Sequence, residues 1–391
     1  MADVLTSVSS GLGRITLNRP EALHALNTSM CAAMTEALLA WRDDASVRAV
    51  MIDHADGTRG FCAGGDIRVL ADSGKTDGAE ARAFFFTEYR LNHLLFTYPK
   101  PIVAIMDGVT MGGGVGISMP ATFRIATERT TYAMPETGIG LFPDVGGGWY
   151  LPRKPGQVGM WLALTGARLK AADCVSAGIA THYVDSSKLA ELKQALASPP
   201  PGGAGAGGGG RSDDSLSGSA TSDRPPSVAL SRDTSPTRGE DDLSAILSRF
   251  STDPGPLKEL TSENRERIDR IFALDSVEAI VAALEADGSD WSKAQLATLA
   301  TKSPQTLKVS FRQLREGAAM PSFADEMRQE YAIASRVVMR HDFAEGVRAL
   351  IVDKDNSPKW DPPTLAGVTD AMLDEIFAPM PAGQDWSPLV A

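Results

Sequence analysis

Hydrophobic residues recur with two alternating periods along the first 197 residues. Short apolar runs at 11–18, 47–52, 102–106 and 123–126 predict strands, and the unbroken run at 47–52 is typical of a strand covered on both faces. At 27–41 and 79–98 the apolar positions recur every three to four residues, which predicts helices. This alternation predicts an α/β fold with right-handed crossovers.

The pattern changes after residue 240, where helical periods follow one another without strands. Several of these segments begin at a Ser or Asp that can cap a helix. Ser303 before Pro304 is one such start, because the first turn of a helix leaves its N–H groups unpaired and proline has none. The predicted helices are 242–250, 262–272, 276–286, 290–301, 303–316, 322–339 and 342–350.

Residues 198–240 separate these two parts and consist largely of Gly, Pro, Ser, Asp and Arg, with no aromatic residue. Such a segment cannot bury enough apolar surface to offset its ordering entropy, so we expect a disordered linker. The predicted organisation is therefore a catalytic core at 1–197, a linker at 198–240 and a helical C-terminal region at 241–391.

Composition and charge indicate which binding partners and which cellular compartment to expect. A net charge of −11 over 391 residues gives no basic face, so nucleic acid is not an expected partner. Three widely spaced cysteines fit a reducing compartment, and no Cys or His pair has zinc-ligand spacing, so no metal is expected. The apolar stretch 102–119 contains Asp107 and several glycines, which argues against a membrane helix. The first residues resemble neither a secretory signal nor a transit peptide. We expect a soluble cytoplasmic protein, or a mitochondrial matrix protein if the source is eukaryotic.

Two glycine motifs are candidates for binding an oxyanion. They are FCAGGDI at 61–67 and MGGGVG at 111–116. Glycines allow sharp turns and close approach of backbone N–H groups to a ligand. Two such N–H groups aimed at one oxygen would form an oxyanion hole, which stabilises the charge that develops when a thioester reacts. The alternative is that both motifs are tight turns required only for packing.

Three acids lie in apolar surroundings and are candidates for acid–base chemistry. Glu136 and Asp144 follow Met134-Pro135 and Phe142-Pro143, and Glu88 lies within a helix rich in phenylalanine and leucine. Apolar neighbours raise the pKa of a carboxyl group into a range useful for proton transfer. The alternative is that all three are exposed, which helical phase does not decide for Glu88. Cys62 has no histidine evidently placed to activate it and is interpreted as a small packing residue.

Four motifs in this order resemble the crotonase (enoyl-CoA hydratase/isomerase) superfamily: LNRP at 17–20, FCAGGD at 61–66, the glycines of 108–116 and MPE at 134–136. Hydratases of that superfamily carry a second catalytic glutamate where this chain has Gly116, and a glycine where it has Asp144. The stretch 134–153 and the C-terminal segments 303–317 and 341–360 instead resemble the 3-hydroxyisobutyryl-CoA hydrolases. Two departures are the long segment 198–240 and His24, where many relatives have asparagine.

The resemblance implies a fold and a set of roles. The fold would be a superhelical spiral of ββα units with helices at the C-terminal end. The thioester carbonyl of an acyl-CoA would lie between the N–H groups of Gly65 and Gly113. Glu136 would attack it or activate a water, Asp144 would hold the substrate hydroxyl or position that water, and Glu88 would contact the acyl end. Further substrate contacts would come from Gly64, Asp66 and Ile67. No separate cofactor is implied, because CoA is part of the substrate.

Two other functions are also compatible with the sequence. An enoyl-CoA hydratase or isomerase is one, since Glu136 alone could serve an isomerase. A non-catalytic CoA-binding scaffold that uses 198–240 for interactions is the other, although a scaffold would not require the acids and glycine motifs. Superfamily members often form trimers or pairs of trimers, so a homo-oligomer is a further expectation.

Overall fold

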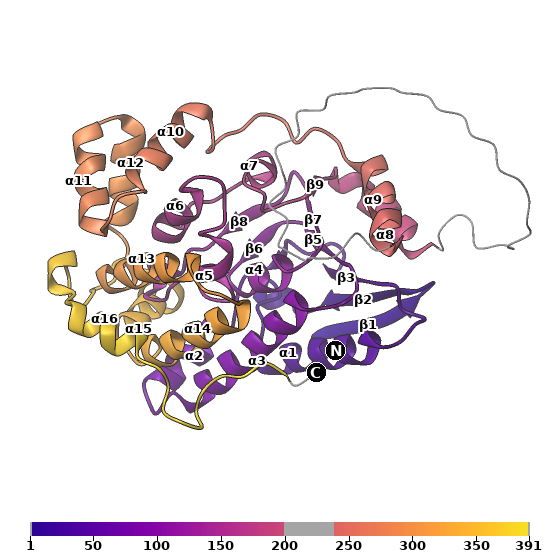
Figure 1. Ribbon diagram of the computed structural model, residues 1–391, viewed down its shortest axis with the longest axis horizontal. Coiled ribbons are helices and arrows are strands. Elements are labelled where there is room, and N and C mark those ends of the chain that lie inside the picture. Colours follow the sequence, from indigo (N-terminus) through magenta and orange to yellow (C-terminus); the bar gives the residue numbers. More distant parts are fainter. Residues whose placement is uncertain (1, 199–237, 390–391) are drawn as a thin grey trace, which may run out of the picture.

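The computed structural model describes residues 2–198 and 238–389 (Figure 1). The predicted linker at 198–240 therefore lies almost wholly outside the described residues. The predicted division of the chain into three parts stays a prediction.

A six-stranded sheet forms the centre of the molecule, in the order β1-β2-β3-β5-β7-β9. Strands β1 and β2 are antiparallel, and every later neighbour is parallel. Its strands are β1 (Val4–Ser9), β2 (Leu12–Leu17), β3 (Ala49–His54), β5 (Ile102–Met106), β7 (Phe123–Ala126) and β9 (His182–Tyr183).

A second sheet of three short parallel strands lies beside the first, in the order β4-β6-β8. These strands are β4 (Gly60–Cys62), β6 (Val109–Met111) and β8 (Thr131–Ala133). Each directly follows a strand of the large sheet along the chain, so the pairs β3-β4, β5-β6 and β7-β8 repeat one unit. The repetition confirms the predicted crotonase-like spiral of ββα units. It also brings the ends of β4, β6 and β8 to one edge.

Successive side chains of the central strands point to opposite faces of the six-stranded sheet, so each face carries its own apolar layer. On β3, Val50 and Ile52 belong to the main core, whereas Ala49 and Met51 belong to a smaller cluster on the other face. Helices α1 and α3 supply much of the main core, and α8 and α9 cover the smaller cluster. In Figure 1, α8 and α9 accordingly lie together on the side of the sheet away from α13–α16.

The α-helices of the core are α1 (Thr28–Arg42), α2 (Ile67–Gly74), α3 (Ala79–Phe96), α4 (Gly113–Ser118), α5 (Gly147–Tyr150), α6 (Val158–Thr165), α7 (Ala171–Ser176) and α8 (Leu189–Ala197). Those of the C-terminal region are α9 (Arg238–Phe250), α10 (Ser262–Ile271), α11 (Val277–Asp287), α12 (Asp290–Leu299), α13 (Pro304–Ala318), α14 (Phe323–Val337), α15 (His341–Val347) and α16 (Asp370–Phe377). Short 3₁₀ turns are η1 (Pro20–Ala22), η2 (Glu136–Ile139), η3 (Ser186–Lys188) and η5 (Leu365–Gly367), and η4 (Arg348–Val352) is a π-helical turn.

The predicted helices of both parts are present, with small shifts at their ends. Asn27 caps α1 by accepting a hydrogen bond from the Met30 N–H at 2.8 Å, and Ser303 caps α13 as its sequence predicts. The predicted helix 342–350 was wrong at its end, because α15 stops at Val347 and continues as the π-helical turn.

Strand β1, the two-residue strand β9 and the three strands of the small sheet did not appear among the predicted elements. Five of the six residues of β1 are exposed, so its sequence lacks the alternation that marks a half-buried strand. The small-sheet strands have three residues each, which is too short for a periodic signal.

The C-terminal helices pack directly on the core through aromatic residues. Phe323 at the start of α14 stacks on Phe96 at the end of α3, with ring centroids 4.2 Å apart, and also contacts Trp149 and Tyr150. The main apolar core continues without a break from the sheet into α13 and α14. Among the described helices, none is long and apolar enough to cross a membrane.

Candidate active site

The two glycine turns, residues 63–66 and 111–114, meet at the edge of the small sheet. Strands β4 and β6 are parallel neighbours, so both turns leave the sheet at the same end. A Cβ built on Gly114 would lie only 2.4 Å from the Cys62 carbonyl oxygen, which explains why glycine is required there. Close packing of the turns is therefore a property of the backbone itself.

The N–H groups predicted to bind the oxyanion are available. Leu26 bridges the first turn by donating to the Gly64 carbonyl at 2.7 Å and accepting from the Asp66 N–H at 2.9 Å. These bonds leave the Gly65 N–H unused. In the described part of the chain, neither it nor the Gly113 N–H at the start of α4 has an acceptor. Two unpaired donors on adjoining turns fit the geometry of an oxyanion hole.

Glu136 lies beside these turns and is buried, with 4% of its surface exposed. It follows β8, the third strand of the small sheet, and opens η2. Its Oε1 is 3.3 Å from the position of a Cβ on Gly112, and its Oε2 has no hydrogen-bond partner. Burial, and then the charge of Asp144, raise the pKa of Glu136 well above its usual value, which the nearby Lys302 partly offsets. The group is a strong base when ionised.

Asp144 is buried in the same region and is oriented by Tyr89, whose hydroxyl donates to Oδ2 at 2.8 Å. Burial raises the pKa of Asp144 to about 6, although the Tyr89 hydrogen bond acts in the opposite direction. Near neutral pH this carboxyl group is therefore close to the point at which it exchanges a proton.

The loop that carries Asp144 is held by the C-terminal helices. The Glu330 carboxylate of α14 accepts the N–H groups of Gly146 and Gly148 at 2.8 and 3.1 Å. Gln313 of α13 donates to both Glu330 and the Pro143 carbonyl, at 3.0 and 2.9 Å. The C-terminal region thus supplies the support for this acid, which its sequence did not indicate.

Glu88 faces the second glycine turn from α3. It is 2% exposed, which decides the question that helical phase left open. Its Oε1 has no partner and lies 2.7 Å from the position of a Cβ on Gly113. Burial, with a contribution from Asp144, raises the pKa of Glu88 well above its usual value. Three buried carboxyl groups with raised pKa values therefore lie in one region, a pattern that is typical of functional sites.

The structure brings most of the predicted residues together. The site contains Gly64, Gly65, Gly113, Glu88, Glu136 and Asp144. Ile67 begins α2, and Asp66, the residue before it, is paired with Arg19 at 2.8 Å. Tyr89, Lys302 and Glu330 also belong to this region but were not among the site residues predicted from the sequence. Tyr89 adjoins Glu88 on α3 and could have been found there, whereas the other two are distant in sequence.

Cys62 is fully buried, and burial raises the pKa of its thiol to about 12. Its interpretation as a packing residue agrees with this, because the nucleophilic thiolate is disfavoured. Across residues 2–198 and 238–389, no group of three His, Cys, Asp or Glu side chains could hold a metal ion. The expectation of a site without metal or separate cofactor stays a prediction.

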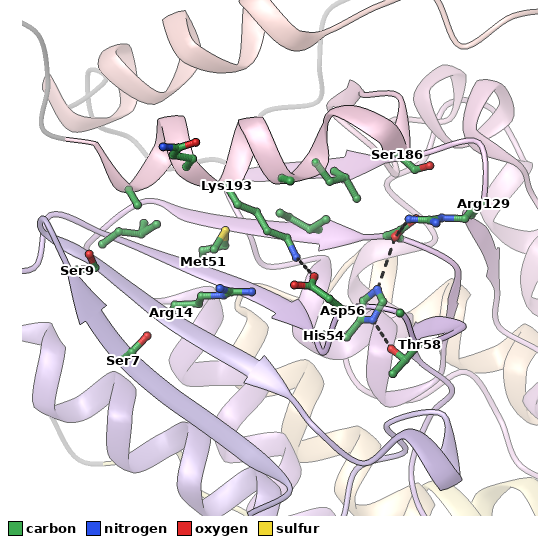
Figure 2. A pocket seen from close by; sticks show the side chains of 18 residues that line it. Ser7, Ser9, Arg14, Met51, His54, Asp56, Thr58, Arg129, Ser186 and Lys193 are labelled. Atoms are coloured by element: carbon green, nitrogen blue, oxygen red, sulfur yellow. Dashed lines mark hydrogen bonds and ion pairs between the residues drawn. The ribbon is translucent and has the colours of Figure 1, made fainter.

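A cavity of about 620 Å³ lies elsewhere, between the six-stranded sheet and α8 (Figure 2). It contains none of the predicted site residues. Its charged groups are paired, since Lys193 contacts both Asp53 and Asp56, at 2.8 and 3.0 Å, and Arg14 also contacts Asp53, at 2.7 Å. These charged side chains neutralise one another, and the candidate site remains the one at the glycine turns.

The raised pKa of Asp144 predicts a pH-dependent stability. The pKa is about 6 in the folded protein and 3.8 for an unperturbed aspartate, so the folded state binds this proton more tightly. Stability from this group is present at low pH and is lost as pH rises from about 4 to about 6. In Asp144→Asn this loss is absent. The free energy of unfolding of the variant relative to wild type should therefore increase across this range by about 1–3 kcal/mol. Urea unfolding between pH 4 and 8 measures it, and a difference independent of pH would contradict the assignment.

Comparison with known proteins agrees with this geometry. The model of the enoyl-CoA hydratase/isomerase family matches residues 12–207 and 220–377. The chain is 42% identical to a protein from Gallus gallus named 3-hydroxyisobutyryl-CoA hydrolase, mitochondrial, over 97% of this chain and 89% of that protein. It is 43% identical to the protein of the same name from Danio rerio, over 96% and 90% of the two chains.

A solved structure is also similar over the whole chain. It is described as a carnitinyl-CoA dehydratase from Mycobacterium thermoresistibile, with a TM-score of 0.82, 39% identity and 98% coverage of both chains. The family match, the long relatives and the shared fold agree with the paired glycine turns and the buried glutamate. This chain belongs to the enoyl-CoA hydratase/isomerase family.

Proposed function

We propose that this protein hydrolyses the thioester of 3-hydroxyisobutyryl-CoA, or of a related short β-hydroxyacyl-CoA, to the free hydroxy acid and CoA, as a step of valine catabolism. The observation that carries the proposal is the position of Glu136. Its buried carboxyl group, with one oxygen unpaired, adjoins the second glycine turn, and within the described residues the N–H groups of Gly65 and Gly113 have no acceptor. The names of the relatives from Gallus gallus and Danio rerio support the same activity.

The reaction needs a polarised carbonyl and a nucleophile. With the thioester oxygen between the N–H groups of Gly65 and Gly113, negative charge that develops on it is stabilised by two donors. Water adds to the carbonyl carbon, the C–S bond breaks, and the CoA sulfur leaves with a proton. In this route, Glu136 takes the proton from water and delivers it to sulfur. In the alternative route, the Glu136 carboxylate attacks the carbonyl carbon itself and the C–S bond breaks, with CoA leaving as its thiolate. Water then cleaves the resulting anhydride, regenerates the carboxylate and supplies the proton that the thiolate takes up.

Gly116 argues against hydration of an enoyl-CoA as the main reaction. A Cβ on the Gly116 backbone would lie 2.6 Å from the Val145 Cβ, so this position of α4 cannot carry the side chain of a second glutamate. Hydratases in this family require that second acid, as the resemblance implies. The rival activity nevertheless needs a direct test, because the similar solved structure is described as a dehydratase.

The experiment measures free-thiol release from 3-hydroxyisobutyryl-CoA beside hydration of crotonyl-CoA, with the same enzyme preparation. Fast thiol release with little hydration is expected. Hydration without thiol release would contradict the proposal and would show that Asp144 and Gly116 do not decide the reaction.

Compartment and assembly belong to the same proposal. The relatives are named mitochondrial, which supports the matrix as the compartment if this chain comes from a eukaryote. The acyl-CoA substrate is the expected partner, and size-exclusion chromatography with light scattering would test the expected homo-oligomer.

A further inference from the structure

Two helices face each other at the candidate site with matched spacing. On α3, Glu88 and Asn92 are four residues apart and therefore share one face. On α4, Gly113 and Gly116 are three residues apart and also share one face. The Glu88 carboxyl lies against Gly113, and the Asn92 amide lies against Gly116, with Nδ2 2.8 Å from the position of a Cβ there.

Asn92 is a polar side chain without a polar partner. It is 0% exposed, and neither its Nδ2 nor its Oδ1 makes a hydrogen bond in the described part of the chain. A buried amide left unsatisfied costs free energy, typically about 1–3 kcal/mol. A ligand that forms hydrogen bonds with this amide would offset the cost. Neither the predicted roles nor the proposed mechanism uses this residue.

The surroundings of Asn92 indicate which part of a substrate it meets. Gly113 supplies an oxyanion donor, and Gly116 lies about one helical turn further along α4, about 5 Å away. A short acyl chain whose carbonyl is held at Gly113 extends over that distance. Val145, which also contacts Gly116, supplies an apolar wall beside the amide. The arrangement suits a chain with one polar group near its end.

We propose that Asn92 is a specificity-determining residue that binds the 3-hydroxyl group of the acyl chain, an inference that rests on the proposed function. The amide N–H donates to the hydroxyl oxygen, and Oδ1 accepts the hydroxyl proton, so both unpaired atoms of Asn92 become satisfied. Asp144, already oriented by Tyr89, then remains free to position water. An acyl chain without the hydroxyl gains neither of these hydrogen bonds and is therefore cleaved more slowly than the hydroxylated chain.

The test compares 3-hydroxyisobutyryl-CoA with isobutyryl-CoA, which lacks only the hydroxyl, in wild type, Asn92→Leu and Asn92→Ala. Leucine preserves the side-chain volume and alanine does not, so the two variants differ in packing but lose the same polar group. Wild type is expected to prefer the hydroxylated substrate in kcat/KM. Both variants should lose this preference by about ten-fold to a hundred-fold, with rates on isobutyryl-CoA within about three-fold of wild type.

Several outcomes overturn the proposal. An equal loss on both substrates would make Asn92 a structural residue, and an unchanged preference would remove it from hydroxyl recognition. Different preferences in the leucine and alanine variants would assign the effect to packing. If wild type cleaves neither ester, the proposed function fails. Titration of the three proteins with both CoA esters still measures the hydroxyl preference as a ratio of Kd values.

Discussion

Glu136→Gln is expected to lower kcat for thioester hydrolysis by about 10²–10⁴-fold while the Kd for the CoA ester stays within a few-fold of wild type. Glutamine has nearly the same shape, so the packing around η2 is retained. It cannot accept a proton or attack a carbonyl, and both proposed routes need one of these abilities. Burial raises the pKa of Glu136, so the wild-type carboxylate is a stronger base than one in water, and its removal has a correspondingly large effect.

The measurement is the initial rate of thiol release under saturating substrate, with binding followed by titration of the CoA ester. Glu266→Gln is the matched control, because this substitution makes the same chemical change at an exposed residue of α10. A Glu136→Gln variant that keeps more than about a tenth of the wild-type kcat would contradict the catalytic role, since general acid–base assistance alone accounts for at least about 10².

Gly114→Ala is expected to reduce kcat by about 10²-fold or more, although the substituted residue keeps its N–H group. The added Cβ would lie 2.4 Å from the Cys62 carbonyl oxygen and 2.9 Å from the Cys62 Cβ. Carbon and oxygen atoms cannot approach so closely, so the two glycine turns must separate. The separation moves the Gly113 N–H away from the Gly65 N–H. Loss of one oxyanion donor alone costs about 10²–10³ in kcat.

Gly57→Ala provides the comparison for this variant. A Cβ on Gly57 meets nothing within 4 Å, but its φ of +78° makes alanine strained there. The control therefore carries a backbone cost of about 1–2 kcal/mol without contact with the site. Both proteins are assayed at a temperature at which thermal unfolding shows them folded. A folded Gly114→Ala protein with wild-type kcat would show that the spacing of the turns does not set the oxyanion geometry.

The sequence predicted α1 and α3 of the core and α9 to α15 of the C-terminal region because their apolar residues recur at helical spacing and several begin at a capping residue. Strands β2, β3, β5 and β7 of the large sheet were predicted from short apolar runs such as 102–106. The small sheet was missed because three-residue strands such as β4 carry no period, and β1 was missed because it is almost entirely exposed. The order of the glycine and glutamate motifs was sufficient to indicate the family.

Some features of the candidate site could also be predicted from the sequence, and others could not. The sequence by itself determined which residues are candidates, because glycine motifs and acids among apolar neighbours are local patterns. Glu136, Asp144 and the two glycine motifs were identified in this way, and the resemblance to the crotonase superfamily then selected Gly65 and Gly113 within the motifs. It could not determine that Glu88 is buried, since a helix period fixes the face only relative to its own neighbours. It also could not identify Asn92 as unpaired. Hydrogen-bond satisfaction depends on every atom that packs around an amide, including Gly116 from another helix.

Only the tertiary structure decided how the site is supported. Glu330 holds the Asp144 loop from more than 180 residues away, and Lys302 lies near Glu136 from the same distant region. Such contacts arise when the C-terminal helices pack on the core through Phe323 and its aromatic neighbours. No local period or spacing encodes them, because they join segments that become neighbours only when the chain folds. The sequence therefore determined which reactive groups the chain contains, and the packing of the C-terminal helices on the core decided which of these groups are buried, oriented and unpaired.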